Sequence, residues 1–498
     1  MTTSLCGRSA ALLVLFSAVA NAQVHYHPDG GPWKQRARKG PDAVVDGWYY
    51  NLGETGIRVQ LMEDTLHHLL VKHVFEGSPA HGRVKVGDVI TGAGGRPFKT
   101  EHWNGYGMKV FGPEGPLLEF SKALSAAQSP KGKSKLLISL KRDGTSKKVS
   151  LKVGQKYGAY AKKFPEGCPK SEKIVRDLLV YLTDQQRDDG SWGNPVHDTY
   201  APLALLANGK KHRKAVEKNV RFHARTTHAQ DESSLINWRY TTAAIVMSEY
   251  YLATQESWVV PELQEVYDFL ISTQYMSLSQ VSPRVKESHP DAFPRNPLQQ
   301  NGGWGHNPGF EGYGPIAMIT GLGALSFALM SRCGIEVDRE RHDAAYAFLE
   351  RASGDNGYVW YGDSAGGGPN DWADMGRTGA AGIANFLSPY QRGTYNRRAL
   401  EHARVIGEHP ESFPDTHGSP ILGMGYAALA AHCDGKSFRR LMDANEWWFV
   451  LSQCHDGTFY YQPNRDNAGY GADSRLSASA VTAFIFSMPK RTLILTGK

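Results

Sequence analysis

The chain has 498 residues, of which 41% are hydrophobic and 21% charged, and its formal net charge is +7. This composition excludes a disordered or collagen-like chain, and the length exceeds that of an ordinary single domain, so we expect two modules. Clusters of basic residues, such as 131–135 and 210–213, fall in apparent turns. We interpret them as solvated loops and predict no nucleic-acid partner.

The first 22 residues have the pattern of an export signal. Arg8 precedes an apolar run from Ala10 to Ala20, and small residues at Ala20 and Ala22 stand before Gln23. The run is too short to cross a bilayer, and no later stretch reaches the roughly 20 apolar residues of a membrane helix. We therefore expect an exported protein, periplasmic or secreted, that is cleaved near Ala22-Gln23 and has no membrane span.

The cysteines remaining after cleavage are Cys168, Cys333, Cys433 and Cys454. Four cysteines allow three pairings, and the sequence does not choose among them. Buried thiols or one structural bridge are both compatible with an exported protein. The wide spacing is unlike that of a zinc site, so we predict no metal.

A first module is expected at residues 45–155, after an N-terminal segment at 23–44. Strand signals occur at 57–61 and 69–74, a helix is predicted at 117–128, and the Asp143-Gly144 turn predicts a hairpin between 136–140 and 149–153. The string Gly77-Ser-Pro-Ala80, followed by Val86-Gly-Asp-Val-Ile90, resembles PDZ domains of the bacterial protease-associated type. The resemblance implies an α+β domain that is mostly β.

PDZ domains bind an extended peptide by strand addition, and a loop of backbone amides holds its terminal carboxylate. By resemblance this loop consists of Gly53, Glu54, Thr55, Gly56 and Ile57, and the implied partner is a peptide or a protein C-terminus. The alternative is that this domain packs permanently on the second module.

A second module is expected at residues 165–498, after a linker at 156–164. Six apolar helices rich in small residues begin near Thr199, Tyr240, Tyr313, Arg377, His417 and Arg475, at intervals of about 40–70 residues. Helices with a charged face lie between them, at 173–185, 260–272, 338–351 and 438–453. Alternation of the two kinds predicts an inner and an outer ring, an (α/α)6 toroid of six helical hairpins.

A second repeat supports the ring. Gln186 to Trp192, Gln300 to Trp304, Asn356 to Tyr358, and Gln453 to Phe459 are similar to the Gln-x-x-x-Gly-x-Trp repeats of squalene cyclases. The resemblance implies a fold of the terpenoid cyclase and protein prenyltransferase type. In that superfamily the Gln and the aromatic ring brace the end of an outer helix.

The catalytic motifs of that superfamily are incomplete. The segment equivalent to the cyclase Asp-x-Asp-Asp motif is Asp371-Trp372-Ala373-Asp374, in which Ala373 occupies the place of the proton donor. The Asp-x-Cys zinc pair of the prenyltransferases does not occur. We therefore predict no cofactor, and the absence of both motifs favours a protein without catalytic activity.

Polar residues at the starts of the inner helices remain as site candidates, because a closed ring brings these starts to one concave face. The candidates are His306, Glu311, Tyr313, Asp371, Asp374, Arg377, His417 and Arg475. Glycan lyases and hydrolases on similar toroids combine a carboxylate or Tyr with His and Arg at such a mouth. Asp198, Asp415 and Asp473 are instead interpreted as helix N-caps.

The two joined modules resemble an exported bacterial family of unknown function. Our main hypothesis is a binding or scaffold protein, whose PDZ-like domain takes a peptide and whose toroid presents a central pocket for a glycan or an apolar ligand. The alternative is a carbohydrate-active lyase or hydrolase on the toroid. A divergent terpenoid cyclase is a third hypothesis, which Ala373 and export both disfavour.

Overall fold

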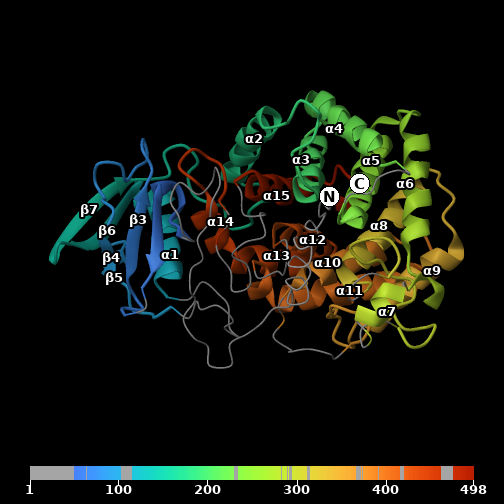
Figure 1. The fold of residues 1–498 in the computed structure, drawn as a ribbon. Coiled ribbons are helices and arrows are strands. Elements are labelled where there is room, and N and C mark those ends of the chain that lie inside the picture. The colour runs from blue at the N-terminus through green and yellow to red at the C-terminus, as the bar shows by residue number, and fades with distance from the viewer. Residues whose placement is uncertain are drawn as a thin grey trace, which may run out of the picture.

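The protein combines a β-sheet module with a ring of helices that lies beside it (Figure 1). The structure, a computed structural model, describes residues 50–62, 64–102, 115–228, 234–281, 283–288, 290, 294–310, 314–365, 372, 374–390, 392–414, 420–460, 462 and 475–498. The predicted signal at 1–22 and the segment 23–44 lie outside the described residues. None of the described helices combines the length and the apolar character that crossing a membrane requires.

The N-terminal module is an antiparallel sheet with one helix, α1 (Pro116–Gln128), on its inner face. Its strands are β1 (Tyr50–Asn51), β2 (Ile57–Leu61), β3 (Leu69–Val74), β4 (Val89–Ala93), β5 (Arg96–Pro97), β6 (Lys135–Arg142) and β7 (Thr145–Lys152). The order is β1-β2-β3-β4-β6-β7, with β5 paired to β4. The predicted hairpin is confirmed, because the Asp143-Gly144 turn joins β6 to β7 in the register Arg142↔Thr145.

The inner ring consists of six helices. They are α3 (Pro195–Ala207), α5 (Ile236–Thr254), α8 (Ala317–Arg332), α10 (Met375–Leu387), α12 (Pro420–His432) and α15 (Arg475–Ser487). Each contacts the next in chain order, and α15 contacts α3, so the ring is closed as predicted. Small residues permit this packing: a Cβ added to Gly379 of α10 would lie 2.4 Å from the backbone of Tyr426 in α12.

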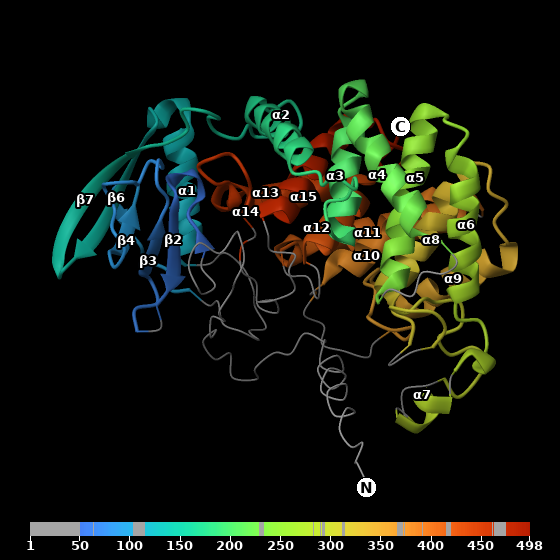
Figure 2. The same ribbon diagram turned by 45° about the horizontal axis from the view of Figure 1, so that its top comes forward.

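The outer helices pack on this ring from outside (Figures 1 and 2). They are α2 (Pro169–Asp184), α4 (Arg213–Thr226), α6 (Val259–Thr273), α9 (Arg339–Ala352), α11 (Arg392–Glu408), α13 (Gly435–Ala444) and α14 (Glu446–Ser452). The prediction of a single helix at 438–453 is wrong, since the helix is interrupted at Asn445, between α13 and α14. The Asn445 side chain donates hydrogen bonds to the backbone oxygens of Pro410 and Leu441.

Trp192, Trp304 and Gln186 brace the outer helices, as the resemblance implied, whereas the Gln453 side chain makes no hydrogen bond to any described residue. The Trp192 and Trp304 indoles donate hydrogen bonds to the backbone oxygens of Leu182 and Leu270, near the ends of α2 and α6. Gln186 bonds to two backbone oxygens, those of Gly190 and Ala215. In the next repeat the bracing amide belongs to Gln274, which bonds to Gly302 and Arg341, and not to the predicted Gln300.

The four cysteines Cys168, Cys333, Cys433 and Cys454 are all free thiols. Three are buried and Cys433 is half-buried. Of the two possibilities left open by the sequence, the structure therefore has thiols and no bridge.

Candidate functional site

The loop expected to hold a peptide carboxylate is closed. In β2, Val59 pairs with Tyr50 and Arg58 pairs with Asn51 of β1, so this chain already occupies the strand edge where a peptide would add. The Glu54 carboxylate turns inward, where its Oε1 accepts hydrogen bonds from the Gln128 side chain at 2.9 Å and from the Gly154 amide.

The same loop is packed against the ring. A Cβ on Gly53 would lie 2.7 Å from the backbone oxygen of Val450 in α14. Asn51 and Gln462 form a reciprocal pair, with 3.1 Å from the Asn51 amide to the Gln462 Oε1 and 3.0 Å from the Gln462 Nε2 to the Asn51 oxygen. Carboxylate capture by this loop is therefore wrong, and the alternative of permanent packing describes the structure.

A buried lysine completes this seam between the modules. Lys170, at the start of α2, is 1% exposed and donates to Gln128 Oε1 at 2.9 Å. Gln128 in turn donates to Glu54, so one amide bridges the two charges. Burial lowers the pKa of Lys170 to about 8, although the Glu54 charge opposes this shift.

At the mouth of the ring, the structure describes four of the eight predicted site residues, which are His306, Asp374, Arg377 and Arg475. The others, Glu311, Tyr313, Asp371 and His417, lie outside the described residues, as do Ala373, Asp415 and Asp473. Asp374 and Arg377 are brought together, while His306 and Arg475 have other neighbours.

The best-formed cluster lies at the start of α10. The buried guanidinium of Arg377 donates to Asp374 Oδ2 at 2.6 Å, to the Tyr358 hydroxyl at 2.8 Å and to the Val359 oxygen at 2.7 Å. Asp374 is the residue before the helix, yet its carboxylate makes no capping hydrogen bond. Asp374 therefore binds Arg377 and does not cap the helix.

The backbone at this cluster is strained. Trp372 and Asp374 have φ angles of 58° and 57°, in the left-handed region that side chains other than glycine rarely adopt. Such strain persists only where the surroundings enforce it, and it gathers at functional sites. Here the strained backbone orients the Trp372 indole and the Asp374 carboxylate, which are two residues apart in the chain.

Aromatic side chains surround the cluster. Trp372 stacks on His409, with ring centres 3.9 Å apart and planes 9° apart. Tyr358 lies edge-on to both Trp360 and Trp372, at 5.1 and 5.7 Å, and Arg377 lies 5.9 Å from the Tyr361 ring. Trp372 and Tyr361 are half-buried and reach the surface, whereas Tyr358 and Trp360 are buried.

Tyr358 was missed as a site residue because it was interpreted as scaffold. The structure corrects its place in the repeat, because Val359 pairs with Ser353 as Phe459 pairs with Gln453. Tyr358 therefore lies one residue before the position of Trp192, Trp304 and Phe459, and the spacing Gly357-Tyr358-Val359 in the sequence is the signal that could have distinguished it. Its hydroxyl supplies a polar atom to the cluster.

His306 and Arg475 belong to other parts of the mouth. The Trp238 indole of α5 donates to His306 Nδ1 at 2.8 Å and stacks on its ring. Arg475, at the start of α15, forms an ion pair with Asp456 at 2.7 Å. Its guanidinium also lies 5.3 Å from the ring of Phe75, which belongs to the sheet module.

Asp198 is not an N-cap, which corrects the prediction. It lies inside the first turn of α3, 4% exposed, and its Oδ1 accepts from the Trp192 amide at 2.7 Å. Burial raises its pKa to about 7. In three other repeats a hydroxyl accepts the hydrogen bond of the corresponding amide, from Trp304 to Thr320, Val359 to Thr378 and Phe459 to Ser479. Asp198 is therefore part of the scaffold.

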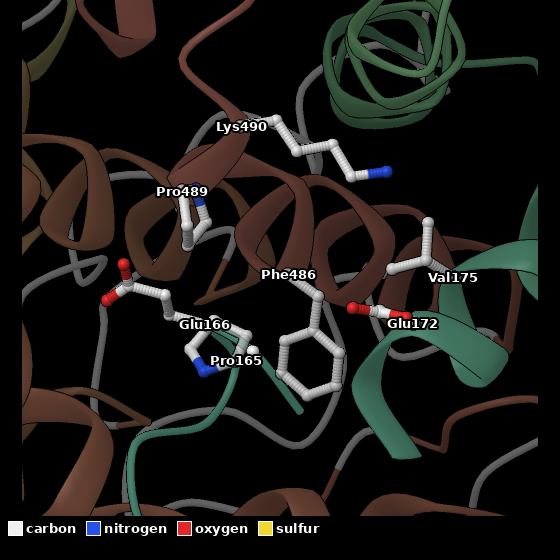
Figure 3. A pocket seen from close by; sticks show the side chains of 8 residues that line it. Pro165, Glu166, Glu172, Val175, Phe486, Pro489 and Lys490 are labelled. Atoms are coloured by element: carbon white, nitrogen blue, oxygen red, sulfur yellow. The ribbon is translucent and has the colours of Figure 1, made fainter. Parts of the chain in front are cut away.

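Two cavities lie at the opposite end of the inner helices. One, of about 160 Å³, is lined by Phe486, Lys490 and the start of α2, and Figure 3 shows the Phe486 ring between the carboxylates of Glu166 and Glu172. The other, of about 380 Å³, lies beside Phe386 and Arg332. Neither includes a predicted mouth residue, so both are distinct from the cluster at α10.

In a comparison with known protein families, the chain matches the family described as "Domain of unknown function (DUF6288)" over residues 171–497. The chain belongs to this family. The matched region contains the whole ring and leaves out the sheet module. The comparison with curated proteins gave no match.

Several solved structures share the fold of the ring. An α-1,6-mannanase of family GH76 from Salegentibacter sp. HEL1_6 is 12% identical, and the match covers 64% of this chain and 99% of that one with a TM-score of 0.46. A family 88 glycosyl hydrolase from Bacteroides vulgatus is 12% identical, with coverages of 65% and 99% and a TM-score of 0.42. A type II terpene cyclase from Scytonema is 12% identical, with coverages of 65% and 97% and a TM-score of 0.40.

The main functional hypothesis, a peptide-binding scaffold without catalytic activity, is corrected. The toroids that the chain resembles include several glycosyl hydrolases, although at these identities the likeness concerns the fold alone. The chain's own geometry gives the physical reason, since β1 and the Glu54 hydrogen bonds close the predicted peptide site. The alternative of a carbohydrate-active protein remains.

Proposed function

We propose that the chain is a carbohydrate-active enzyme, a glycan hydrolase or lyase, that works where Asp374, Arg377 and Tyr358 meet at the start of α10. The observation that carries the proposal is that one buried guanidinium binds both a carboxylate and a phenol hydroxyl. A carboxylate and a hydroxyl in fixed positions are the groups that proton transfer to and from a sugar requires.

The surrounding side chains suit a sugar. Aromatic faces provide flat apolar surfaces, and the half-buried Trp372 is fixed by its stack on His409. Arg377 holds its two partners with hydrogen bonds of 2.6 to 2.8 Å, so they need little reorganisation when a substrate arrives. In this role Arg377 is a positioning residue, while Asp374 and Tyr358 are the candidates for contact with the substrate.

The test is a cleavage assay on a panel of neutral and acidic oligosaccharides, following new reducing ends and the ultraviolet absorbance of unsaturated uronates. Reducing ends alone indicate a hydrolase, and both signals together indicate a lyase. We expect Asp374→Asn and Tyr358→Phe to lower kcat by about 100-fold or more, because each removes a proton-transfer group. Tyr358→Phe should melt close to the wild type, whereas Asp374→Asn leaves the buried Arg377 without its counter-charge and should melt lower, so the assay is run well below both melting temperatures.

The matched control is Asp456→Asn, which alters a second acid–arginine pair at the mouth, at 2.7 Å from Arg475. It should retain cleavage. The proposal is overturned if the wild type cleaves no glycan of the panel, or if Asp374→Asn and Asp456→Asn are affected equally.

Two further statements accompany this proposal. We propose that the sheet module is a PDZ-like domain that serves as a structural support for the ring, on the basis of its strand, helix and hairpin order. We also propose that the protein is exported, on the basis of the sequence pattern at residues 1–22.

A further inference from the structure

The net positive charge of the chain is concentrated in the segment that contains the β6–β7 hairpin. Residues 131–152, which include β6 and β7, hold seven lysines and one arginine against a single aspartate, Asp143. Their net charge of +7 equals the formal net charge of the whole chain, so the remaining residues are neutral overall. In both views of the ribbon, β7 lies at the end of the molecule farthest from the ring (Figures 1 and 2).

Four of these lysines share the outer face of the hairpin. Leu136, Ile138 and Leu140 of β6 are buried on the inner side of the sheet, so alternation places Lys135 and Lys141 on the other face. The pairing register adds Lys148 and Lys152 of β7, which lie opposite Ser139 and Lys135. We call Lys135, Lys141, Lys148 and Lys152 the basic sheet face, and all four are exposed.

This arrangement opposes the stability of the sheet. Lys135 and Lys152 are directly opposite each other, and like charges in that position repel. Within the described part of the chain, none of the four lysines has an ion-pair partner. Lysines often protect an edge strand from aggregation, and β7 is such an edge. That explanation does not cover Lys135 and Lys141, because β6 lies between β4 and β7 inside the sheet.

We propose that the basic sheet face binds a linear anionic polysaccharide. Lys135 and Lys141 are six residues apart, which spans about 20 Å along a strand, and the second strand lies about 4.8 Å away. The row on β6 and the shorter row on β7, which spans four residues or about 13 Å, fit an extended chain of carboxylates or sulfates. The partner is held by charge, with release of its counterions.

The chemistry of the face argues against two other polyanions. Membrane-surface binding needs apolar side chains that enter the lipid, and the outer face of β6 offers only the half-buried Leu137. Single-stranded nucleic acid is held by aromatic stacking as well as charge, and β6 and β7 contain no aromatic residue. A polysaccharide held at the sheet would raise the local concentration of glycan near the ring.

The test is a binding titration of the full chain with polygalacturonate and with dextran sulfate, which separates carboxylate from sulfate as the anionic group, and with neutral dextran. Lys135→Gln/Lys152→Gln should weaken binding of the polyanion roughly ten-fold at low salt and reduce its salt dependence. The same variant should raise Tm, because it removes the opposed charges. Binding and stability therefore change in opposite directions, which misfolding cannot produce.

The matched control is Lys214→Gln/Lys436→Gln, which removes two exposed lysines from α4 and α13. It should bind as the wild type does. The proposal is overturned if the wild type binds neither polyanion, if the control loses as much affinity, or if anionic vesicles or DNA bind as tightly. Because binding is measured without turnover, a negative result leaves the proposed function untouched, and Asp374→Asn should bind normally.

Discussion

The starts of α3 and α10 each carry an aspartate, and the two acids are used differently. Asp198 points into the protein, where it accepts a backbone amide and the Asn219 side chain. Asp374 stands one residue before its helix in a strained conformation and binds Arg377. Both are largely buried, at 4% and 8% exposure, so burial does not distinguish them.

The partner of each carboxylate shows the difference. Asp198 takes the place that Thr320, Thr378 and Ser479 occupy in other repeats. Its carboxylate accepts the backbone hydrogen bond that a hydroxyl accepts there. In α10 the Thr378 hydroxyl accepts this backbone hydrogen bond, so Asp374 is not needed for it. An acid at the mouth is thus a site candidate only when another group accepts the hydrogen bond from the corresponding backbone amide of its repeat.

The largest expected effect concerns Asp198 and pH. Because its folded pKa is raised to about 7, the folded state keeps a proton that the unfolded chain releases near pH 4. The stabilising contribution is complete below pH 4 and is lost as pH rises to 7, by up to about 4 kcal/mol. Asp198→Asn does not titrate, so its Tm advantage over the wild type should grow from pH 4 to 7.

Melting curves between pH 4 and 8 measure this effect. Asp184→Asn, at an exposed position of α2, is the control and should run parallel to the wild type. A Tm difference for Asp198→Asn that does not change with pH would mean that Asp198 is ionised in the fold, and the comparison with Asp374 would fail. Glycan cleavage should persist in Asp198→Asn.

A smaller effect is expected for Thr378→Val. The Thr378 hydroxyl accepts the Val359 amide at 3.1 Å, and both residues are fully buried. The substitution leaves that amide without a partner and should lower the free energy of unfolding by about 2 kcal/mol. Urea unfolding measures the loss, and Thr378→Ser should restore most of it. Equal stability of the Val variant would contradict the repeat interpretation.

The smallest effect is expected at the seam between the modules. Lys170→Met alone removes one buried charge, but it leaves Glu54 without the lysine that Gln128 connects to it. Glu54→Gln/Lys170→Met removes both charges and should be more stable than either single variant, by about 1 kcal/mol. A double-mutant cycle by urea unfolding measures this coupling. Additive effects would show that Gln128 does not connect the two charges.

The sequence by itself determined the ring. Six helices rich in small residues alternate in the sequence with helices that have a charged face. Both patterns are local: the first kind of helix must be buried, and the second kind must keep its charged face exposed. The hairpin at Asp143-Gly144 is equally local, because a two-residue turn fixes its register. The bracing role of Trp192 and Trp304 was implied by the resemblance of their repeats to those of squalene cyclases.

Only the tertiary structure decided which polar residues form a cluster and which surfaces stay open. Asp374, Arg377 and Tyr358 meet because a strained turn and the third repeat lie at the same helix start. The predicted peptide loop is closed by Asn51 and by a helix some 400 residues further along the chain. Such contacts depend on how distant segments pack, and a pattern of neighbouring residues carries no record of that packing.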